Sequence, residues 1–263
     1  KFDLRIESPE KSPVPKAVDD ITFEVKGIDA DGAEFYPKSD IDKIFSYLIG
    51  KKISLSELRE ATQILEKKYK DDNFFLVRVL IPPQEVEDGI FKIKVIEGYI
   101  NKVFIDGGKK NSRKKILSII KKLENKKPID LPALERALLL LNDLPGISGN
   151  GVLRQGSEVG SSELLVTINP PPPTSYLLTL NNGASKTMGQ YSTNINATYN
   201  NPDYPSSVSM GFSSALKNDD DQLFNPILKA FNGTYSTSLG DDGLIFSLGA
   251  LFANAKPQGS LKS

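Results

Sequence analysis

The chain has 263 residues with 33 basic and 33 acidic side chains, a formal net charge of zero, and no Cys or His. Because the charges balance, there is no basic surface of the kind that binds nucleic acid electrostatically, and we expect no nucleic-acid partner. Without Cys or His, thiol and imidazole groups are excluded as catalytic nucleophiles or bases and as metal or haem ligands.

The leader and the first strand have simple patterns. Residues 1–18 are polar and carry three prolines, which predicts a flexible, extended leader. Apolar and polar residues alternate over 21–26, which predicts a half-buried strand that stops at Gly27. We expect Ser39 to cap the helix that follows and Gly50 to end it.

The next helix has the clearest start signal in the sequence. Ser54 and Glu57 stand at capping-box spacing, so their side chains and backbone amides can satisfy each other. Strands are predicted at about 74–81 and 90–97, separated by a turn that contains two prolines and Gly89. The expected result is a small sheet with two helices on one face, at residues 19–98.

The same order of elements then repeats at residues 99–169. A strand with alternating Asn101, Val103 and Ile105 precedes an apolar helical stripe, and Asp130 is predicted to cap a second helix. Two strands complete the unit. Both units are therefore predicted to be β-α-α-β-β, in the α+β class.

The character of the sequence changes at the proline run 170–173. About 55 of the 66 charged residues precede it, and no Arg or Glu follows it. Residues 170–263 instead show about five segments in which apolar residues alternate with Ser, Thr, Asn and Gln, which is typical of a transmembrane β-barrel wall. No run of about 18 apolar residues exists, so a membrane role must use strands. Five strands cannot enclose a pore, so we expect the barrel to be truncated.

Several segments resemble a known family. Residues 78–98 (RVLIPPQEVEDGIFKIKVIEG) with 99–105, residues 134–146, and residues 178–189 are similar to the ShlB/FhaC/HecB-type transporters of two-partner secretion. The resemblance implies two POTRA domains, at 19–98 and 99–169, followed by the first strands of an outer-membrane barrel. The family's plug helix is not visible in the leader, and the loop motif expected late in the barrel would fall after Ser263.

The resemblance implies a location in the bacterial outer membrane, with the POTRA domains in the periplasm. The partners would be a secreted protein in extended form and outer-membrane lipid, with no cofactor and no small-molecule substrate. The POTRA domains would recognise the unfolded client and deliver it to the barrel without ATP. A sheet edge can bind such a chain by strand addition, and we expect this at the strand 74–81 and the groove beside the helix 54–69.

The candidate client-binding residues belong to this helix, strand and turn: Leu58, Leu65, Phe74, Val77, Val79 and Gln84. The candidate pore-lining residues alternate along one strand: Gln190, Ser192, Asn194, Asn196 and Thr198. Gln84 has a second interpretation, as a group that only makes local hydrogen bonds, and this interpretation is preferred.

Other polar groups have simpler interpretations. Glu97 with Gly98 is interpreted as a domain hinge, and the lysine pairs 114–115 and 121–122 as the solvated face of a helix. The aspartates 219–221 lack the spacing of a calcium loop and are interpreted as a solvated loop.

Two alternatives to secretion stay open at this point. A barrel-assembly factor of the same superfamily is possible, although such factors usually have more POTRA units. In a periplasmic binding or chaperone module, the later strands would form a soluble sandwich, which needs no detergent. An enzyme is the remotest option, since no carboxylate pair stands out.

Overall fold

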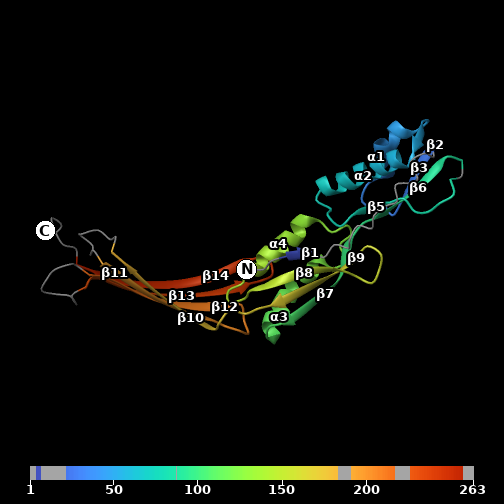
Figure 1. Ribbon diagram of the computed structural model, residues 1–263. Coiled ribbons are helices and arrows are strands. Elements are labelled where there is room, and N and C mark those ends of the chain that lie inside the picture. Colours follow the sequence, from blue (N-terminus) through green and yellow to red (C-terminus); the bar gives the residue numbers. More distant parts are fainter. Residues whose placement is uncertain (1–3, 7–21, 87, 183–190, 217–225, 257–263) are drawn as a thin grey trace.

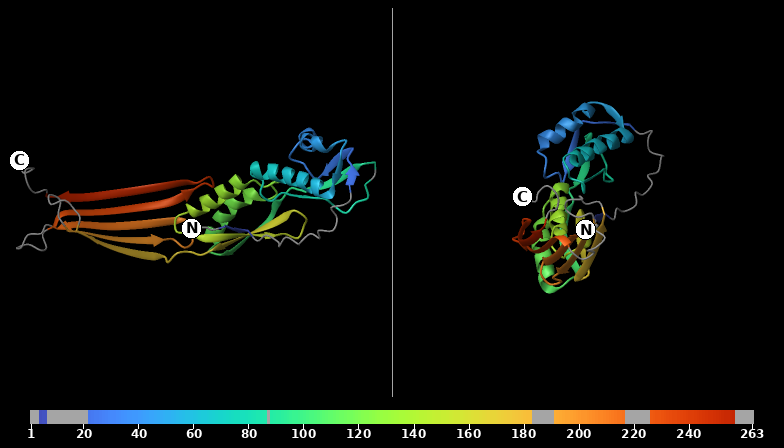
Figure 2. Two further views of the ribbon diagram at one scale, coloured as in Figure 1. Left: turned by 45° about the horizontal axis from the view of Figure 1, so that its top comes forward. Right: turned by 90° about the vertical axis from the view of Figure 1, so that its left-hand side faces the viewer.

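The computed structural model describes residues 4–6, 22–86, 88–182, 191–216 and 226–256. The molecule is elongated, with two helix-and-sheet units at one end and a long antiparallel sheet that extends away from them (Figures 1 and 2). Each of the two units has its own cluster of buried apolar side chains.

The first unit combines a three-stranded sheet, a two-stranded ribbon and two helices. The ribbon pairs β2 (Thr22–Glu24) with β4 (Lys52–Ser54), and the sheet has the order β3 (Gly27–Asp31), β6 (Ile90–Ile96), β5 (Arg78–Leu80). The helices are α1 (Lys38–Phe45), continued by a 3-10 turn (Ser46–Leu48), and α2 (Leu55–Asp71). Side chains of both helices and of β6 share one core.

Of the two helix starts in this unit, the sequence predicted the cap of α2 correctly and the cap of α1 wrongly. The capping box of α2 is confirmed: Glu57 N–H donates to Ser54 Oγ at 3.3 Å, and Ser54 N–H donates to Glu57 Oε2 at 2.7 Å. The prediction that Ser39 caps α1 is wrong, because Pro37 occupies the N-cap position with φ −63° and ψ 147°. The proline ring fixes this φ, so the helix begins one residue before Ser39.

Two strands of the first unit also differ from the prediction. The strand expected at 21–26 ends earlier, at Glu24, where the chain leaves the ribbon. Gly27, which was expected to end that strand, is instead the first residue of β3 and pairs with Ile90. The strand expected at 74–81 is limited to β5. The residues before it, Phe75 and Leu76, pack instead against the core of the second unit.

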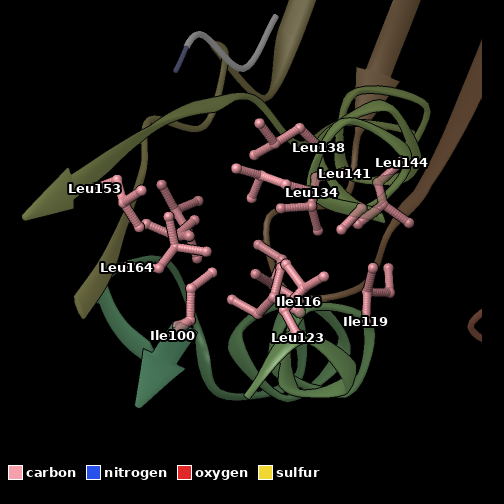
Figure 3. Close-up of a cluster of buried hydrophobic side chains, with 14 of the residues drawn as sticks. Ile100, Ile116, Ile119, Leu123, Leu134, Leu138, Leu141, Leu144, Leu153 and Leu164 are labelled. Carbon is pink, nitrogen blue, oxygen red and sulfur yellow. The ribbon is translucent and has the colours of Figure 1, made fainter. Parts of the chain in front are cut away.

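The second unit follows the predicted order. It consists of β7 (Tyr99–Gly107), α3 (Lys110–Ile120) with a 3-10 turn (Lys121–Leu123), α4 (Leu131–Asn142), β8 (Gly149–Gln155) and β9 (Ser161–Ile168). The Asp130 cap of α4 is confirmed, since Asp130 Oδ1 accepts a 2.6 Å hydrogen bond from the Ala133 amide. Figure 3 shows the core, in which Ile116 of α3, Leu134 of α4 and Leu164 of β9 point toward one another.

The sheets of the two units have the same topology. In both, the first and last strands pair in parallel and the last two pair antiparallel, giving β3-β6-β5 and β7-β9-β8. This agreement supports the internal repeat. The second sheet has one addition: β1 (Leu4–Ile6) pairs in parallel with the outer edge of β8. The leader therefore contributes a strand, which its sequence did not predict.

The third sheet is an antiparallel meander of five strands in chain order, which confirms the expected number and pattern. The strands are β10 (Thr174–Asn181), β11 (Tyr191–Asn200), β12 (Ser206–Leu216), β13 (Pro226–Leu239) and β14 (Leu244–Ala255). Over the described residues this sheet is open, with β10 and β14 at its edges. The predicted α+β class with a C-terminal antiparallel sheet is confirmed.

Candidate functional site

A large groove of the first unit lies between α2 and the edge strand β5. It has a volume of about 1120 Å³ and is lined by side chains of α2, of β5 and of the turn after β5. Its floor is apolar, with Leu55, Val79 and Phe91. An apolar floor beside a sheet edge suits an extended peptide, whose backbone can pair with the strand while alternate side chains enter the groove.

The structure divides the six predicted client-binding residues into two groups. Val79 and Gln84 line the groove, although the Val79 side chain is itself buried in the core, at 7% exposure. The other four are buried in the core below it: Leu58, Leu65, Phe74 and Val77. These four side chains support α2 and β5 from inside and do not reach the surface in this conformation.

Gln84 is held by the strand that follows it. Its Nε2 donates to Lys92 O, and its Oε1 accepts from Lys92 N, both at 2.7 Å. The side chain thus makes the pair of hydrogen bonds that a neighbouring strand residue would make. This contact agrees with the local hydrogen-bonding role preferred from the sequence, and it fixes the turn that forms one end of the groove.

The edge of β5 is in contact with a residue that the sequence analysis missed. Glu66 of α2 accepts a 3.3 Å hydrogen bond from the Val79 amide. Because it donates to Glu66 and β5 pairs with β6 on one side only, this amide lies on the open side of β5, away from β6. Glu66 lies on a polar stripe of α2 that lines the groove together with Arg59, Gln63 and Lys70. The helical spacing of these polar residues was the available signal.

Glu97, which directly follows β6, holds the loop before α1 in place. Its side chain is 2% exposed, and its Oε1 accepts hydrogen bonds from the Glu34 and Phe35 amides, both at 2.9 Å, and from the Tyr69 hydroxyl at 2.7 Å. Burial and the bond to Glu97 raise the pKa of Tyr69. This carboxylate therefore has a structural role in the first unit, next to the residue where the second unit begins.

The helix α3 contacts two turns of the long sheet. Lys115 Nζ lies 3.2 Å from Asp241 Oδ1, Ser118 Oγ donates to the same oxygen at 2.8 Å, and Lys122 pairs with Asp242 at 2.8 Å. The interpretation of these lysines as a solvated face is therefore wrong for Lys115, whose side chain is only 15% exposed, while Lys122 stays exposed at 57%. Asn111 and Ser112, at the start of α3, likewise donate to the turn between β11 and β12.

The long sheet has two faces of different chemistry. Four of the five predicted pore-lining residues alternate on the polar face of β11, namely Ser192, Asn194, Asn196 and Thr198. The fifth, Gln190, lies outside the described residues, as do the aspartates 219–221. On the other face, apolar side chains are solvent-exposed, including Phe252 at 74%. Such a sheet has one surface for water and one for lipid.

In the described parts of the chain, no helix combines the length and the apolar character that a membrane span requires. No group of three or more Asp, Glu, Cys or His side chains is placed there to hold a metal ion.

Comparisons with known proteins agree with the resemblance seen in the sequence. Residues 23–98 match the family described as POTRA domain, ShlB-type. The heme/hemopexin transporter protein HuxB of Haemophilus influenzae (strain 86-028NP) is 26% identical over 225 residues, which cover 85% of this chain and 39% of HuxB.

Solved structures show a similar fold. CdiB from Escherichia coli aligns with 88% of this chain and 41% of its own, with a TM-score of 0.64 and 18% identity. CdiB from Acinetobacter baumannii aligns with 93% and 46%, with a TM-score of 0.57 and 18% identity. The chain spans less than half of each of these proteins. Residues 23–98 match a ShlB-type POTRA domain, and the chain has a fold similar to that of CdiB, in agreement with the resemblance to two-partner secretion transporters seen in the sequence.

Proposed function

We propose that the two helix-and-sheet units receive an unfolded secreted protein in the periplasm and pass it to a β-barrel in the outer membrane, without ATP. The ShlB-type POTRA domain, the similarity to the transporter HuxB and the CdiB fold support this role. The client is captured in extended form at the edge of β5 and in the groove beside α2. The polar face of β11 then lines the path through the barrel.

One observation carries the capture step: the same sheet edge is used for strand addition in the second unit. There, β8 occupies the position that β5 has in the first unit, and β1 pairs with its outer edge at Gly151, Val152 and Leu153. The fold therefore accepts an added strand at this edge. In the first unit, no described strand pairs with the outer edge of β5, which leaves it available to a client.

The sheet β10–β14 favours a membrane location over the soluble sandwich. Two sheets packed face to face would bury the apolar side chains between them. Instead, the described strands form one layer, and Tyr176 and Leu180 on its apolar face are 78% and 72% exposed. The chain should therefore need detergent or lipid to stay in solution. A monodisperse chain in plain buffer would contradict the membrane assignment.

Photo-crosslinking tests the capture site. Since the sequence has no Cys, a benzophenone label can be attached at one introduced Cys, either Leu80→Cys on β5 or Ile64→Cys on the far side of α2. The two side chains are equally exposed, at 50% and 48%, but only Leu80 lines the groove. With the full chain in detergent and a short peptide that alternates Val with Thr and Asp, we expect a crosslink from position 80, about tenfold above that from position 64.

A backbone variant provides the second arm. Val79→Pro removes the outward amide of β5 without removing a bond to β6. If this variant keeps its circular dichroism spectrum and melting transition, it should bind the peptide about tenfold more weakly. Equal crosslinking from positions 64 and 80, together with unchanged affinity in Val79→Pro, would show that the client binds elsewhere.

A further inference from the structure

The charges in the groove between α2 and β5 are unequal. Its described lining includes four basic side chains, Arg59, Lys67 and Lys70 from α2 and Arg78 from β5, but Glu66 is its one carboxylate. The chain as a whole has no net charge. The basic excess is therefore a local property of this groove, and it favours an anionic ligand over a neutral or cationic one.

Glu66 is placed where a ligand would bind. Its Oε2 accepts the hydrogen bond from the outward amide of Val79 at 3.3 Å, while its Oε1 lies 2.6 Å from Lys70 Nζ and 3.7 Å from Arg78 Nη1. The Glu66 side chain is only 18% exposed. One side chain thus provides both contacts that an added acidic strand would provide, an acceptor for the edge amide and a negative charge for the two cations.

An incoming strand has to replace both contacts. Its backbone carbonyl can accept from the Val79 amide in the same direction as Glu66 does now. A neutral strand would restore this hydrogen bond but would leave Lys70 and Arg78 without their anion. An acidic strand would restore both, because its own carboxylate can pair with these cations.

We propose that Glu66 is an internal competitor of the client, and that this groove selects extended segments that alternate apolar residues with at least one acidic residue. The proposal rests on the function proposed above and names the kind of segment that the site takes. Glu66 occupies the β5 edge until such a segment displaces it. The same contact covers the edge amide against pairing with neutral strands, including those of other copies of the chain.

The test compares two peptides, an acidic one that alternates Val with Thr and Asp, and a neutral one in which Asn replaces each Asp. Affinities are measured by fluorescence anisotropy with the full chain in detergent. We expect the wild type to bind the acidic peptide about tenfold more tightly than the neutral one. Glu66→Ala should bind the neutral peptide about tenfold more tightly than the wild type does, because the edge amide is released.

Removal of the cations should abolish the preference. The double variant Lys70→Ala/Arg78→Ala should bind both peptides equally, within about a factor of two. The matched control is Lys51→Ala/Lys52→Ala, which removes the same charge from exposed positions that do not line the groove. This control should keep the wild-type preference.

The outcomes separate this inference from the proposed function. If Val79→Pro abolishes binding but Glu66→Ala leaves the neutral peptide's affinity unchanged or weaker, client capture stands and the competitor role of Glu66 is wrong. Equal affinity of the wild type for both peptides, or no binding of either peptide to the wild type and Glu66→Ala, also overturns the inference. If crosslinking and Val79→Pro place the peptide outside the groove, both proposals fail.

Discussion

At the scale of single residues, Glu97 and Gly98 show how the first unit ends. The buried Glu97 carboxylate accepts three hydrogen bonds at one oxygen, two from the loop before α1 and one from Tyr69. At Gly98 a Cβ would lie 2.5 Å from the Leu76 backbone oxygen, so a larger residue does not fit. The carbonyl of Gly98 then accepts a 2.9 Å bond from Ile129 of the second unit. These contacts favour a fixed junction over the hinge inferred from the sequence.

Replacement of Glu97 should loosen the loop before α1. In Glu97→Ala, the Glu34 and Phe35 amides and the Tyr69 hydroxyl lose their acceptor, and leaving buried donors unpaired costs about 1–3 kcal/mol each. Hydrogen–deuterium exchange followed by mass spectrometry should show the peptide that contains residues 32–37 exchanging at least about tenfold faster.

The control for this measurement is Glu60→Ala, which removes an exposed carboxylate from α2. Exchange in residues 32–37 should match the wild type in this control. Unchanged exchange in Glu97→Ala would mean that the loop is held by its aromatic contacts, such as that between Phe35 and Phe74, and not by the carboxylate.

The sequence predicted residues whose signal is local and missed those whose partners are distant. Ser54 and Asp130 cap their helices through bonds that span three positions, and such spacing can be read directly. Glu66 contacts an amide 13 positions away, and Glu97 contacts a loop about 60 positions away. No local pattern encodes these separations, because they depend on how α2 and the sheet pack.

At the scale of elements, β11 has one polar face, suited to water, and one apolar face, suited to lipid. Its register with β12 places Asn194 opposite Ser213 on the polar face and Ile195 opposite Phe212 on the apolar face. The side-chain period of a strand is two, so a shift by one residue would exchange the faces. The unbroken alternation fixes the register, which explains why this strand could be predicted from sequence alone.

Thiol labelling should reproduce this alternation. In the Cys-free chain inserted in liposomes, single Cys variants at residues 192–199 should react with a charged, water-soluble thiol reagent in a period of two. Asn194→Cys and Asn196→Cys should react about tenfold faster than Ile195→Cys and Ala197→Cys, because a lipid-covered thiol ionises poorly and is inaccessible to the reagent. Equal reactivity on both faces would contradict the membrane assignment of β11.

Elements that lack such a pattern were predicted less well. The short strand β5 was expected to be longer, because Phe74, Phe75 and Leu76 are apolar. Their burial has a different cause, since Phe75 and Leu76 pack into the second unit. The strand β1 has three residues and gains its pairing from β8, more than 140 positions away in the chain. Apolar composition alone does not distinguish pairing from packing.

At the scale of the whole molecule, α3 joins the second unit to the long sheet. It contacts the turn after β11 through Asn111 and Ser112, and the turn after β13 through Lys115 and Ser118. All these contacts connect residues 90 or more positions apart. Lys115 of α3 looked solvated in sequence because its partner Asp241 belongs to a segment that the α3 pattern does not include.

The contacts of Asp241 should matter more than those of Asp242 for this arrangement. Asp241 accepts from Ser118 and pairs with the mostly buried Lys115, whereas Lys122 and Asp242 are both exposed. Asp241→Ala should weaken the contact by about 1–2 kcal/mol, while Asp242→Ala should have little effect, as exposed pairs contribute little. Spin labels at Leu139→Cys on α4 and Leu178→Cys on β10 should show a broader distance distribution only in Asp241→Ala.

Acid should have the same effect as Asp241→Ala. The hydrogen bond from Ser118, followed by that from Lys115, holds the pKa of Asp241 below its ordinary value of 3.8. A carboxylate whose pKa is lowered by a contact stabilises that contact fully above its ordinary pKa, and the stabilisation is lost as the pH falls through the lowered pKa. The wild-type distance distribution should therefore stay narrow at neutral pH and broaden below about pH 4. In Asp241→Ala the distribution should already be broad at neutral pH and change less on acidification. A wild-type distribution that stays narrow in acid would show that Asn111 and Ser112 hold α3 on the sheet without this carboxylate.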